Sequence, residues 1–196
     1  MKTIEKLQFH LDPNSKIITK DPVHWVSIET QKKRYDFHHN DLDDPNYVLY
    51  QKKIFDEFIG IYLKQGELLD YGCGEAAILK TFIPNLRVYD LFYHNDVTVF
   101  ESTYDTIILI EVMEHLENPE AVIQKLTKLL KPKGRLIIQT QFYPSLERMS
   151  DWWYVRDVTH VSFYNLESFK YFAARYGFEL IYTDFKSRVV LEKTVL

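Results

Sequence analysis

Hydrophobic side chains from residue 45 onward follow two alternating spacings. Between residues 45 and 64 they recur every three to four positions, as in an amphipathic helix, and Asp44 followed by Pro45 suits its first turn. From residue 67 onward, short apolar runs alternate with further helical segments, which is the pattern of a parallel sheet with crossover helices. This pattern predicts strands over 67–71, 86–89, 106–110 and 135–140, and helices over 76–82, 119–130 and 166–176.

The two ends of the chain differ in how clearly they can be interpreted. Residues 178–185 and 188–195 are apolar runs separated by Lys186 and Ser187, so we expect the sheet to end in an antiparallel hairpin. Residues 1–34 show no clear period, and we treat residues 1–44 as an N-terminal arm or lid and residues 45–196 as one domain. Residues 141–165 form a long aromatic segment without a period, and connections of that length usually carry function.

Composition narrows the class of protein. A chain of 196 residues with 46% hydrophobic and 27% charged residues fits one globular α/β domain. The net charge of -4 gives no field that attracts a phosphate backbone, which argues against a nucleic-acid partner. The single cysteine, Cys73, excludes an internal disulfide. No apolar run approaches the roughly 18 residues that span a bilayer, so we expect no membrane span and a cytoplasmic location.

The segment LLDYGCGEA places two glycines where a buried strand turns into a helix. Asp90 follows Asp70 by twenty positions, the separation at which an acid at the end of the second strand binds ribose hydroxyls. A dinucleotide loop would need a third glycine where Ala77 stands. The Asp70 carboxylate would also repel a pyrophosphate but attract ammonium and sulfonium charges, which favours S-adenosylmethionine as the ligand.

LLDYGCGEA, VYD, IILIEVMEHL, LLKPKGRLIIQT and the closing hairpin together resemble class I S-adenosylmethionine-dependent methyltransferases, in particular small and mostly uncharacterised bacterial members. The resemblance implies a Rossmann-like three-layer α/β sandwich with a seven-stranded, mostly parallel sheet of order 3-2-1-4-5-7-6 and strand 7 antiparallel. Only about fifteen residues separate Asp90 from Asp105, so the third strand must be short or missing.

The resemblance also implies which residues hold the cofactor. The glycine turn would lie beside the methionine part of S-adenosylmethionine, Asp90 on its ribose and Glu111 near its amino end. Asn95 or Asp96 is expected as an adenine contact, and the alternative is an apolar adenine wall formed by Leu91 and Phe92. The full cofactor set is Asp70, Tyr71, Gly72, Cys73, Gly74, Asp90, Leu91, Phe92, Asp96 and Glu111.

Ligands of open α/β sheets bind at the carboxyl ends of the strands, so the aromatic segment should roof an acceptor pocket. The side chains expected to line that pocket are Tyr35, His39, Trp152, Trp153, Arg156 and Tyr164. His160 is the expected base if the acceptor is a hydroxyl, and it competes with an interpretation in which it only ties the loop to the sheet. His115 is the second catalytic candidate. His38 and His39 lack acidic or cysteine partners at metal-ligand spacing, so no metal site is expected.

These features favour an S-adenosylmethionine-dependent methyltransferase that acts on a small-molecule acceptor, at oxygen or nitrogen, and releases S-adenosylhomocysteine. Two alternatives remain at this point. One is a non-catalytic S-adenosylmethionine-binding protein, and the other is a nicotinamide-dependent oxidoreductase, against which the missing third glycine and the Asp70 charge both argue.

Overall fold

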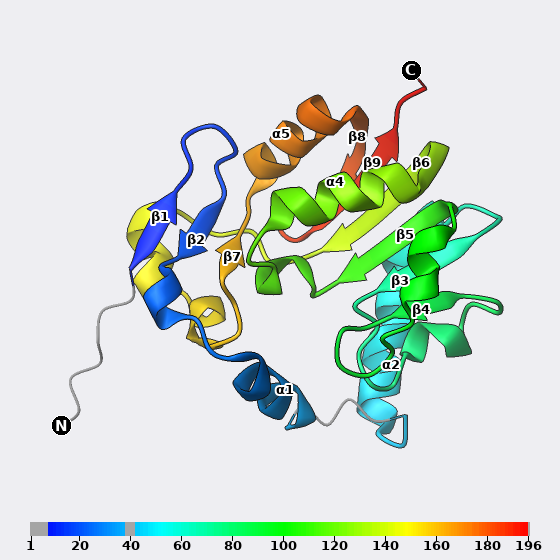
Figure 1. Cartoon of the computed structure of the whole chain (residues 1–196), viewed down its shortest axis with the longest axis horizontal. Helices are drawn as coiled ribbons and strands as arrows, with labels where there is room; N and C mark the ends of the chain where they lie inside the picture. The colour runs from blue at the N-terminus through cyan, green and yellow to red at the C-terminus, as the bar shows by residue number, and fades with distance from the viewer. Residues whose placement is uncertain (1–7, 38–41, 196) are drawn as a thin grey trace.

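A six-stranded sheet forms the centre of the computed structural model, which describes residues 8–37 and 42–195 (Figure 1). In spatial order its strands are β4 (Arg87–Tyr89), β3 (Leu68–Tyr71), β5 (Tyr104–Ile110), β6 (Leu130–Gln139), β9 (Arg188–Lys193) and β8 (Phe178–Thr183). The first four are parallel, whereas β9 runs antiparallel to both of its neighbours. The expected Rossmann-like class and the antiparallel end of the sheet are therefore confirmed.

The third strand of the expected order, predicted to be short or missing, is absent from the described residues, so the sheet has six strands. Residues 90–103 join β4 to β5 through the 3-10 helix η4 (Val97–Glu101) alone. A crossover between parallel strands takes a dozen or more residues, so this segment has no room for a helix and an additional strand. As a result β4 is the edge of the sheet.

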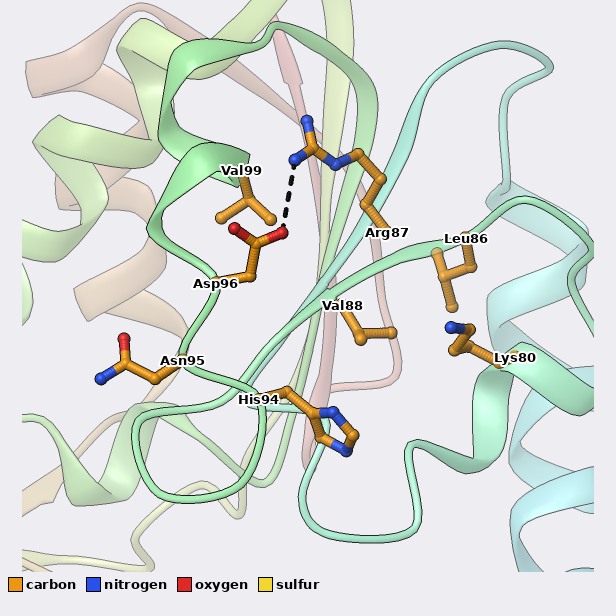
Figure 2. A pocket seen from close by; sticks show the side chains of 8 residues that line it. All are labelled: Lys80, Leu86, Arg87, Val88, His94, Asn95, Asp96 and Val99. Carbon is orange, nitrogen blue, oxygen red and sulfur yellow. Dashed lines mark ion pairs between the residues drawn. The ribbon is translucent and has the colours of Figure 1, made fainter.

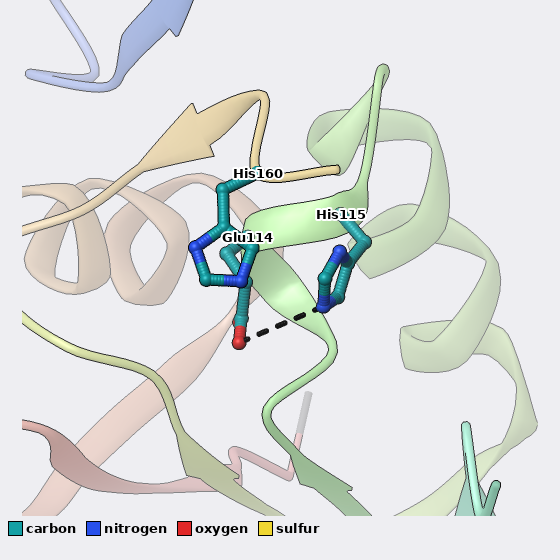
Figure 3. Close-up of side chains that lie close together, drawn as sticks. All are labelled: Glu114, His115 and His160. Carbon is teal, nitrogen blue, oxygen red and sulfur yellow. Dashed lines mark ion pairs between the residues drawn. The ribbon is translucent and has the colours of Figure 1, made fainter. Parts of the chain in front are cut away.

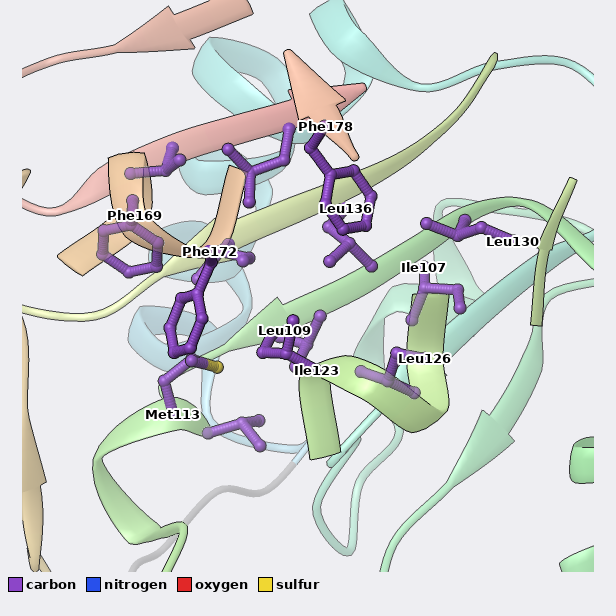
Figure 4. Packing of buried hydrophobic residues seen from close by; sticks show 14 of the residues in the cluster. Ile107, Leu109, Met113, Ile123, Leu126, Leu130, Leu136, Phe169, Phe172 and Phe178 are labelled. Atoms are coloured by element: carbon purple, nitrogen blue, oxygen red, sulfur yellow. The ribbon is translucent and has the colours of Figure 1, made fainter. Parts of the chain in front are cut away.

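Helices cover both faces of the sheet, giving three layers (Figure 1). On one face lie α4 (Pro119–Leu129) and α5 (Leu166–Tyr176), and on the other lie α2 (Pro45–Ile54), the π-helix η2 (Phe55–Ile59) and α3 (Gly60–Tyr62). Because side chains alternate along a strand, Ile107 and Leu109 pack toward α4 and α5 (Figure 4), whereas Ile108 packs toward α2. The helix predicted over 45–64 is thus helical from 45 to 62, with a π turn in its middle.

Local sequence signals fix where the covering helices begin and end. The Asn118 side chain accepts a hydrogen bond from the Ala121 amide at the start of α4, and Asn165 forms a capping box with Ser168 at the start of α5. Gly177 ends α5 with φ +72°, the left-handed conformation that glycine adopts without strain. No helix among the described residues is long and apolar enough to cross a membrane.

A second, small sheet joins the N-terminal arm to the aromatic segment. Its antiparallel strands are β1 (Phe9–Leu11), β2 (Ile18–Lys20) and β7 (Ser162–Phe163). The arm continues through the 3-10 helix η1 (Pro22–His24) and α1 (Ile28–Asp36), which crosses the carboxyl end of the main sheet (Figure 1). The sequence did not predict this sheet, because its strands have only two or three residues each and residues 1–34 show no clear period.

Two local expectations need correction. The segment predicted as a helix over 76–82 forms only the 3-10 helix η3 (Ile78–Thr81), because Ala77 is left-handed, with φ +43°. The final hairpin turns over residues 184–187 rather than over Lys186 and Ser187 alone. There the Asp184 carboxylate accepts hydrogen bonds from three following amides, which makes the turn longer and more rigid.

Phe172, fully buried between α5 and the sheet, should dominate stability among the phenylalanines of this face. Phe172→Ala should lower the free energy of unfolding by about 3–5 kcal/mol, since it removes apolar contacts and leaves a cavity. Phe185→Ala is the matched control, because that ring is 71% exposed, and it should change stability by less than about 0.5 kcal/mol. Urea denaturation followed by circular dichroism measures both, and equal losses would contradict this description of the core.

Candidate active site

The glycine turn after β3 has a backbone free of side chains on one side. Gly72 and Gly74 have φ +84° and +65°, which residues with a side chain rarely adopt. A Cβ on Gly72 would overlap Val112, whereas a Cβ on Gly74 would meet no atom within 4 Å. The amides of Gly72 and Cys73 donate to the carbonyl of Tyr89, at 2.7 and 3.1 Å, which holds the turn against β4. The turn therefore borders open space into which only a ligand can fit closely.

Asp90 fixes that turn from the end of β4. Its carboxylate accepts hydrogen bonds from the amides of Gly74, Phe92 and Tyr93, at 3.0, 2.9 and 3.2 Å. A carboxylate has about four lone-pair positions, so three amide donors leave room for a ligand hydroxyl. The sequence separation from Asp70 thus corresponds to a real convergence of Asp90 with the glycine turn.

Asp70 is buried without a neutralising partner. Its side chain is 4% exposed and makes no hydrogen bond or ion pair with any other described residue. Burial, helped by the nearby Asp90 charge, raises the pKa of Asp70 to about 7. A buried carboxylate of this kind is destabilising unless a cation lies beside it, so the site fits a ligand that carries ammonium and sulfonium charges.

Glu111 follows β5 in a strained backbone conformation. Its φ is +53°, in the left-handed region that is uncommon for residues other than glycine. Gln139 donates to one carboxylate oxygen at 3.1 Å and the Tyr154 hydroxyl approaches the other at 2.9 Å. Burial and the neighbouring Glu114 raise the pKa of Glu111 to about 8. Strain of this kind is typical of residues whose side chain must be held in one place.

The Tyr154 hydroxyl connects two glutamates, because it also approaches Glu114 at 2.6 Å. Glu114 lies in the 3-10 helix η5 (Met113–His115), is 1% exposed and accepts a second hydrogen bond from the Thr140 hydroxyl at 2.9 Å. Burial raises its pKa as well. Two carboxyl groups therefore share a buried polar network between β5, β6 and the aromatic segment 141–165, which we call the roof segment.

The two candidate catalytic histidines lie next to each other and to Glu114 (Figure 3). The rings of His115 and His160 are 4.8 Å apart, and His115 Nε2 is 3.9 Å from Glu114 Oε1. Burial lowers the pKa of both imidazoles, that of His160 to about 3, so both are neutral at physiological pH. His160 also donates to the carbonyl of Tyr154 at 2.8 Å, as the structural alternative requires.

The N-terminal arm closes over this group. Tyr35 of α1 packs between Phe92 and His115, with ring centroids 5.5 and 5.3 Å away. Neighbouring residues of α1 hold both sides, because Arg34 pairs with Asp157 at 3.0 Å and Asp36 accepts a hydrogen bond from Tyr93 at 2.7 Å. The arm thus bridges the loop after β4 and the roof segment.

The other side chains expected in the acceptor pocket have varied surroundings. Trp152 packs on Tyr154 and Phe163 in a small core of the roof segment, and Tyr164 is fully buried with its hydroxyl donating to the carbonyl of Met113. Trp153 and Arg156 are exposed, Trp153 by 63%. His39 lies outside the described residues. The structure therefore brings together Tyr35, His115 and His160, whereas Trp152 and Tyr164 support the roof from inside.

The remaining residues expected to contact the cofactor also differ in their burial and in their neighbours. Tyr71 stacks on Tyr89 within the core, Cys73 is half-buried in the turn, and Leu91 is 54% exposed. Asp96 lies farther along, where it accepts from Thr98 and pairs with Arg87 at 3.8 Å. It borders a surface cavity of about 430 Å³ beside the edge strand β4 (Figure 2). Its adenine role stays a prediction.

Several residues of the site could not be found from the sequence. The sequence indicates Glu114 only as a carboxylate at the start of a helix, and it does not single out Tyr154, Thr140 or Gln139. Each contributes through a contact between segments far apart in sequence, and no local motif marks such contacts. The spacing Glu111-x-x-Glu114-His115 was the available signal, and it becomes informative only once η5 and the roof segment are side by side.

The fold and this site define a class, namely Rossmann-like α/β proteins that hold a nucleoside between a glycine turn and an acid at the end of the second strand. Residues 49–183 match the model of a methyltransferase domain family, and the chain belongs to that family. The expected resemblance to a methyltransferase family is confirmed. The nicotinamide alternative loses its support.

Individual relatives are more distant. A ubiquinone biosynthesis O-methyltransferase of Rickettsia bellii is 31% identical over 99 residues, and the match spans 38% of this chain and 41% of that protein. The N-methyltransferase NodS of Bradyrhizobium japonicum, solved with S-adenosylhomocysteine, superposes with a TM-score of 0.55 at 14% identity, covering 84% of this chain and 97% of NodS. An O-methyltransferase family protein of Burkholderia thailandensis gives 0.56 at 17%, covering 84% and 63%. The solved structures establish the shared fold.

The raised pKa of Asp70 leads to a prediction about how the stability of the folded chain depends on pH. Its folded pKa lies above its unfolded value, so the charged form is disfavoured in the native state and stability falls as pH rises from about 4 to 7. Asp70→Asn should therefore stabilise the chain at pH 8, by an amount on the order of 2–4 kcal/mol, and progressively less as pH approaches 4.

Urea denaturation at pH 8 and pH 5 measures this gain. Asp56→Asn is the control, because that carboxylate is exposed on the π-helix η2 and pairs with Lys52. It should show no gain at either pH. An Asp70→Asn variant with unchanged stability at pH 8 would mean that the carboxylate is already neutralised in the chain.

Proposed function

We propose that this chain transfers a methyl group from S-adenosylmethionine to an oxygen or nitrogen atom of a small-molecule acceptor. The observation that carries the proposal is the combination of an open, side-chain-free turn at Gly74 with two carboxylates, Asp70 and Asp90, that pair with no lysine or arginine of the described residues. Oxygen is the favoured accepting atom, because the curated relatives at 31% identity are O-methyltransferases.

Each part of the cofactor has a complementary group. The buried Asp70 faces the positive charges of the methionine part, and the remaining lone pair of Asp90 accepts a hydrogen bond from a ribose hydroxyl. Phe92, held by Tyr35, gives the adenine an apolar wall. Glu111, whose carboxylate is fixed by Gln139 and Tyr154, lies near the amino end.

Bound S-adenosylmethionine supplies the methyl group: the acceptor atom forms a bond to the methyl carbon while the sulfur–methyl bond breaks, and that electron pair returns to sulfur. The chain's own contribution is alignment and the exclusion of water. Tyr35 and the roof segment close the space beside His115, and the Arg34–Asp157 pair keeps them together.

His160 fits the acceptor side of this site but is a weak base by itself. With a pKa of about 3, its imidazole holds a hydroxyl proton poorly at neutral pH. Its Nε2 is nevertheless unprotonated and lies beside His115 and Glu114, which supports a role in contacting an acceptor oxygen. If the acceptor is a hydroxyl, another group must therefore lower the pKa of that hydroxyl.

Removing the ribose-binding acid tests the cofactor site. Asp90→Ala should weaken binding of S-adenosylhomocysteine by roughly 10–100-fold, because it removes charge-assisted hydrogen bonds and releases the Gly74 amide. Isothermal titration calorimetry measures the dissociation constant, with Asp56→Ala as the surface control. If the unmodified chain gives no heat with millimolar S-adenosylhomocysteine or S-adenosylmethionine, the proposed function fails.

The raised pKa of Asp70 gives the cofactor site a pH dependence. Binding a cation requires the charged carboxylate, which becomes scarce as pH falls below about 7. Affinity for S-adenosylmethionine should be about tenfold weaker at pH 6 than at pH 8 and level off above pH 8. Asp70→Asn should flatten this dependence, whereas Asp56→Asn should leave it intact. Calorimetric titrations across that range measure it, and a pH-independent affinity in the unmodified chain would contradict the role of Asp70.

A further inference from the structure

Three side chains with metal-ligating atoms converge at the acceptor end of the site (Figure 3). Glu114 and His115 come from η5, and His160 comes from the segment just before β7. One carboxylate oxygen and one ring nitrogen from each histidine all lie within 4.8 Å of one another. The chain brings these atoms together from two segments that are 45 residues apart.

Both imidazoles are held with the same nitrogen free. His115 Nδ1 lies 3.1 Å from the carbonyl of Thr159, and His160 Nδ1 lies 2.8 Å from the carbonyl of Tyr154. A carbonyl only accepts, so each Nδ1 carries the hydrogen and each Nε2 keeps an unprotonated lone pair. Neither Nε2 has a hydrogen-bond donor among the described residues. A histidine that donates Nδ1–H to a backbone carbonyl while Nε2 faces a neighbouring ligand is the usual arrangement around bound metal ions.

The third ligand is equally well held and carries an unbalanced charge. Glu114 accepts hydrogen bonds from Tyr154 and from Thr140, which fix its orientation. No lysine or arginine pairs with it in the part of the chain that the structure describes, and the buried Lys20 ammonium instead donates to the carbonyls of Val155 and Asp157. A carboxylate that is 1% exposed normally requires a cationic partner.

We propose that Glu114, His115 and His160 bind one divalent transition-metal ion of the zinc type. Two imidazoles and one carboxylate form the ligand set of catalytic zinc sites, in which a fourth position stays open for water or substrate. Imidazole donors favour zinc, cobalt, iron or nickel over magnesium and calcium. Ligands about 2.1 Å from a tetrahedral ion lie roughly 3.4 Å apart, so side-chain rotations would have to bring the three atoms, now within 4.8 Å of one another, closer together.

Of the three ligands His115 is the most exposed, with 19% of its side chain accessible, whereas Glu114 and His160 are buried. An ion there would contact an acceptor oxygen and lower the pKa of a bound hydroxyl, which supplies the help that His160 alone cannot give. This last role rests on the proposed methyl transfer, whereas metal binding itself does not.

Cobalt(II) is the probe, because its visible absorption reports both binding and coordination geometry. The full-length chain, treated with a chelator and dialysed, should bind one equivalent of Co²⁺ with absorption bands between about 500 and 650 nm, and Zn²⁺ should abolish them by displacement. His160→Gln and Glu114→Gln should each weaken Co²⁺ binding by more than about 100-fold. Thr140→Val, which removes one hydrogen bond to Glu114, should weaken it by about tenfold.

His94→Gln is the matched control, since that histidine contacts the carbonyl of Glu75 away from the cluster, and its Co²⁺ affinity should equal that of the unmodified chain. Thermal melting with and without Zn²⁺ gives a second readout: Zn²⁺ should raise the melting temperature of the unmodified and His94→Gln chains but not of Glu114→Gln. The inference is overturned if the unmodified chain binds Co²⁺ no better than His160→Gln and Glu114→Gln. Calorimetry with S-adenosylhomocysteine, run on the metal-free chain, shows separately whether the methyltransferase proposal stands.

Discussion

Carboxyl groups without lysine or arginine partners at the carboxyl end of the sheet are the constraint on which the site depends. Asp70 lies in β3, Asp90 follows β4, Glu111 follows β5 and Glu114 lies in η5. None of these four carboxyl groups pairs with a lysine or arginine among the described residues. Backbone amides satisfy Asp90, and neutral side chains satisfy the two glutamates, but no cation of the chain offsets their burial. Burial of these carboxyl groups is destabilising, and the region is open at Gly74. The site is therefore suited to cationic ligands.

Two such ligands follow from the same physical argument. In our proposals, Asp70 and Asp90 bind the compound that carries the ammonium and sulfonium charges. Glu114 and two neutral imidazoles, at the acceptor end of the site, bind a divalent ion. Tyr154 connects the halves, because its hydroxyl lies within hydrogen-bond distance of both Glu111 and Glu114. Tyr35 covers both from the arm, against Phe92 on one side and His115 on the other.

The main sheet could be predicted because its strands are buried on both faces. The runs 67–71, 106–110 and 135–140 each contain consecutive apolar residues, and each overlaps a strand of the structure, β3, β5 and β6. The absence of a third strand also followed from the short distance between Asp90 and Asp105. The small sheet could not be predicted, since β7 has two residues and pairs with an arm strand more than 140 positions earlier. Such a pairing leaves no local period.

The same distinction applies to the site. Asp70, Gly72, Gly74 and Asp90 lie within a single strand–turn–strand unit, where sequence spacing determines spatial position. The meeting of His160 with His115 and Glu114 depends instead on the roof segment folding back onto η5, through the Val161 amide and the carbonyl of Glu114 at 2.8 Å. That long-range contact explains why the sequence nominated both histidines but expected no metal.

A crystal structure of the chain with S-adenosylhomocysteine and Zn²⁺, with zinc located by its anomalous scattering, tests the account most directly. We expect the ribose hydroxyls on Asp90, the charged methionine end beside Asp70, and one zinc peak among Glu114, His115 and His160. A nucleoside bound elsewhere, or Asp70 and Asp90 turned away from it, would contradict the central claim that the acidic end of this sheet exists to hold cationic ligands.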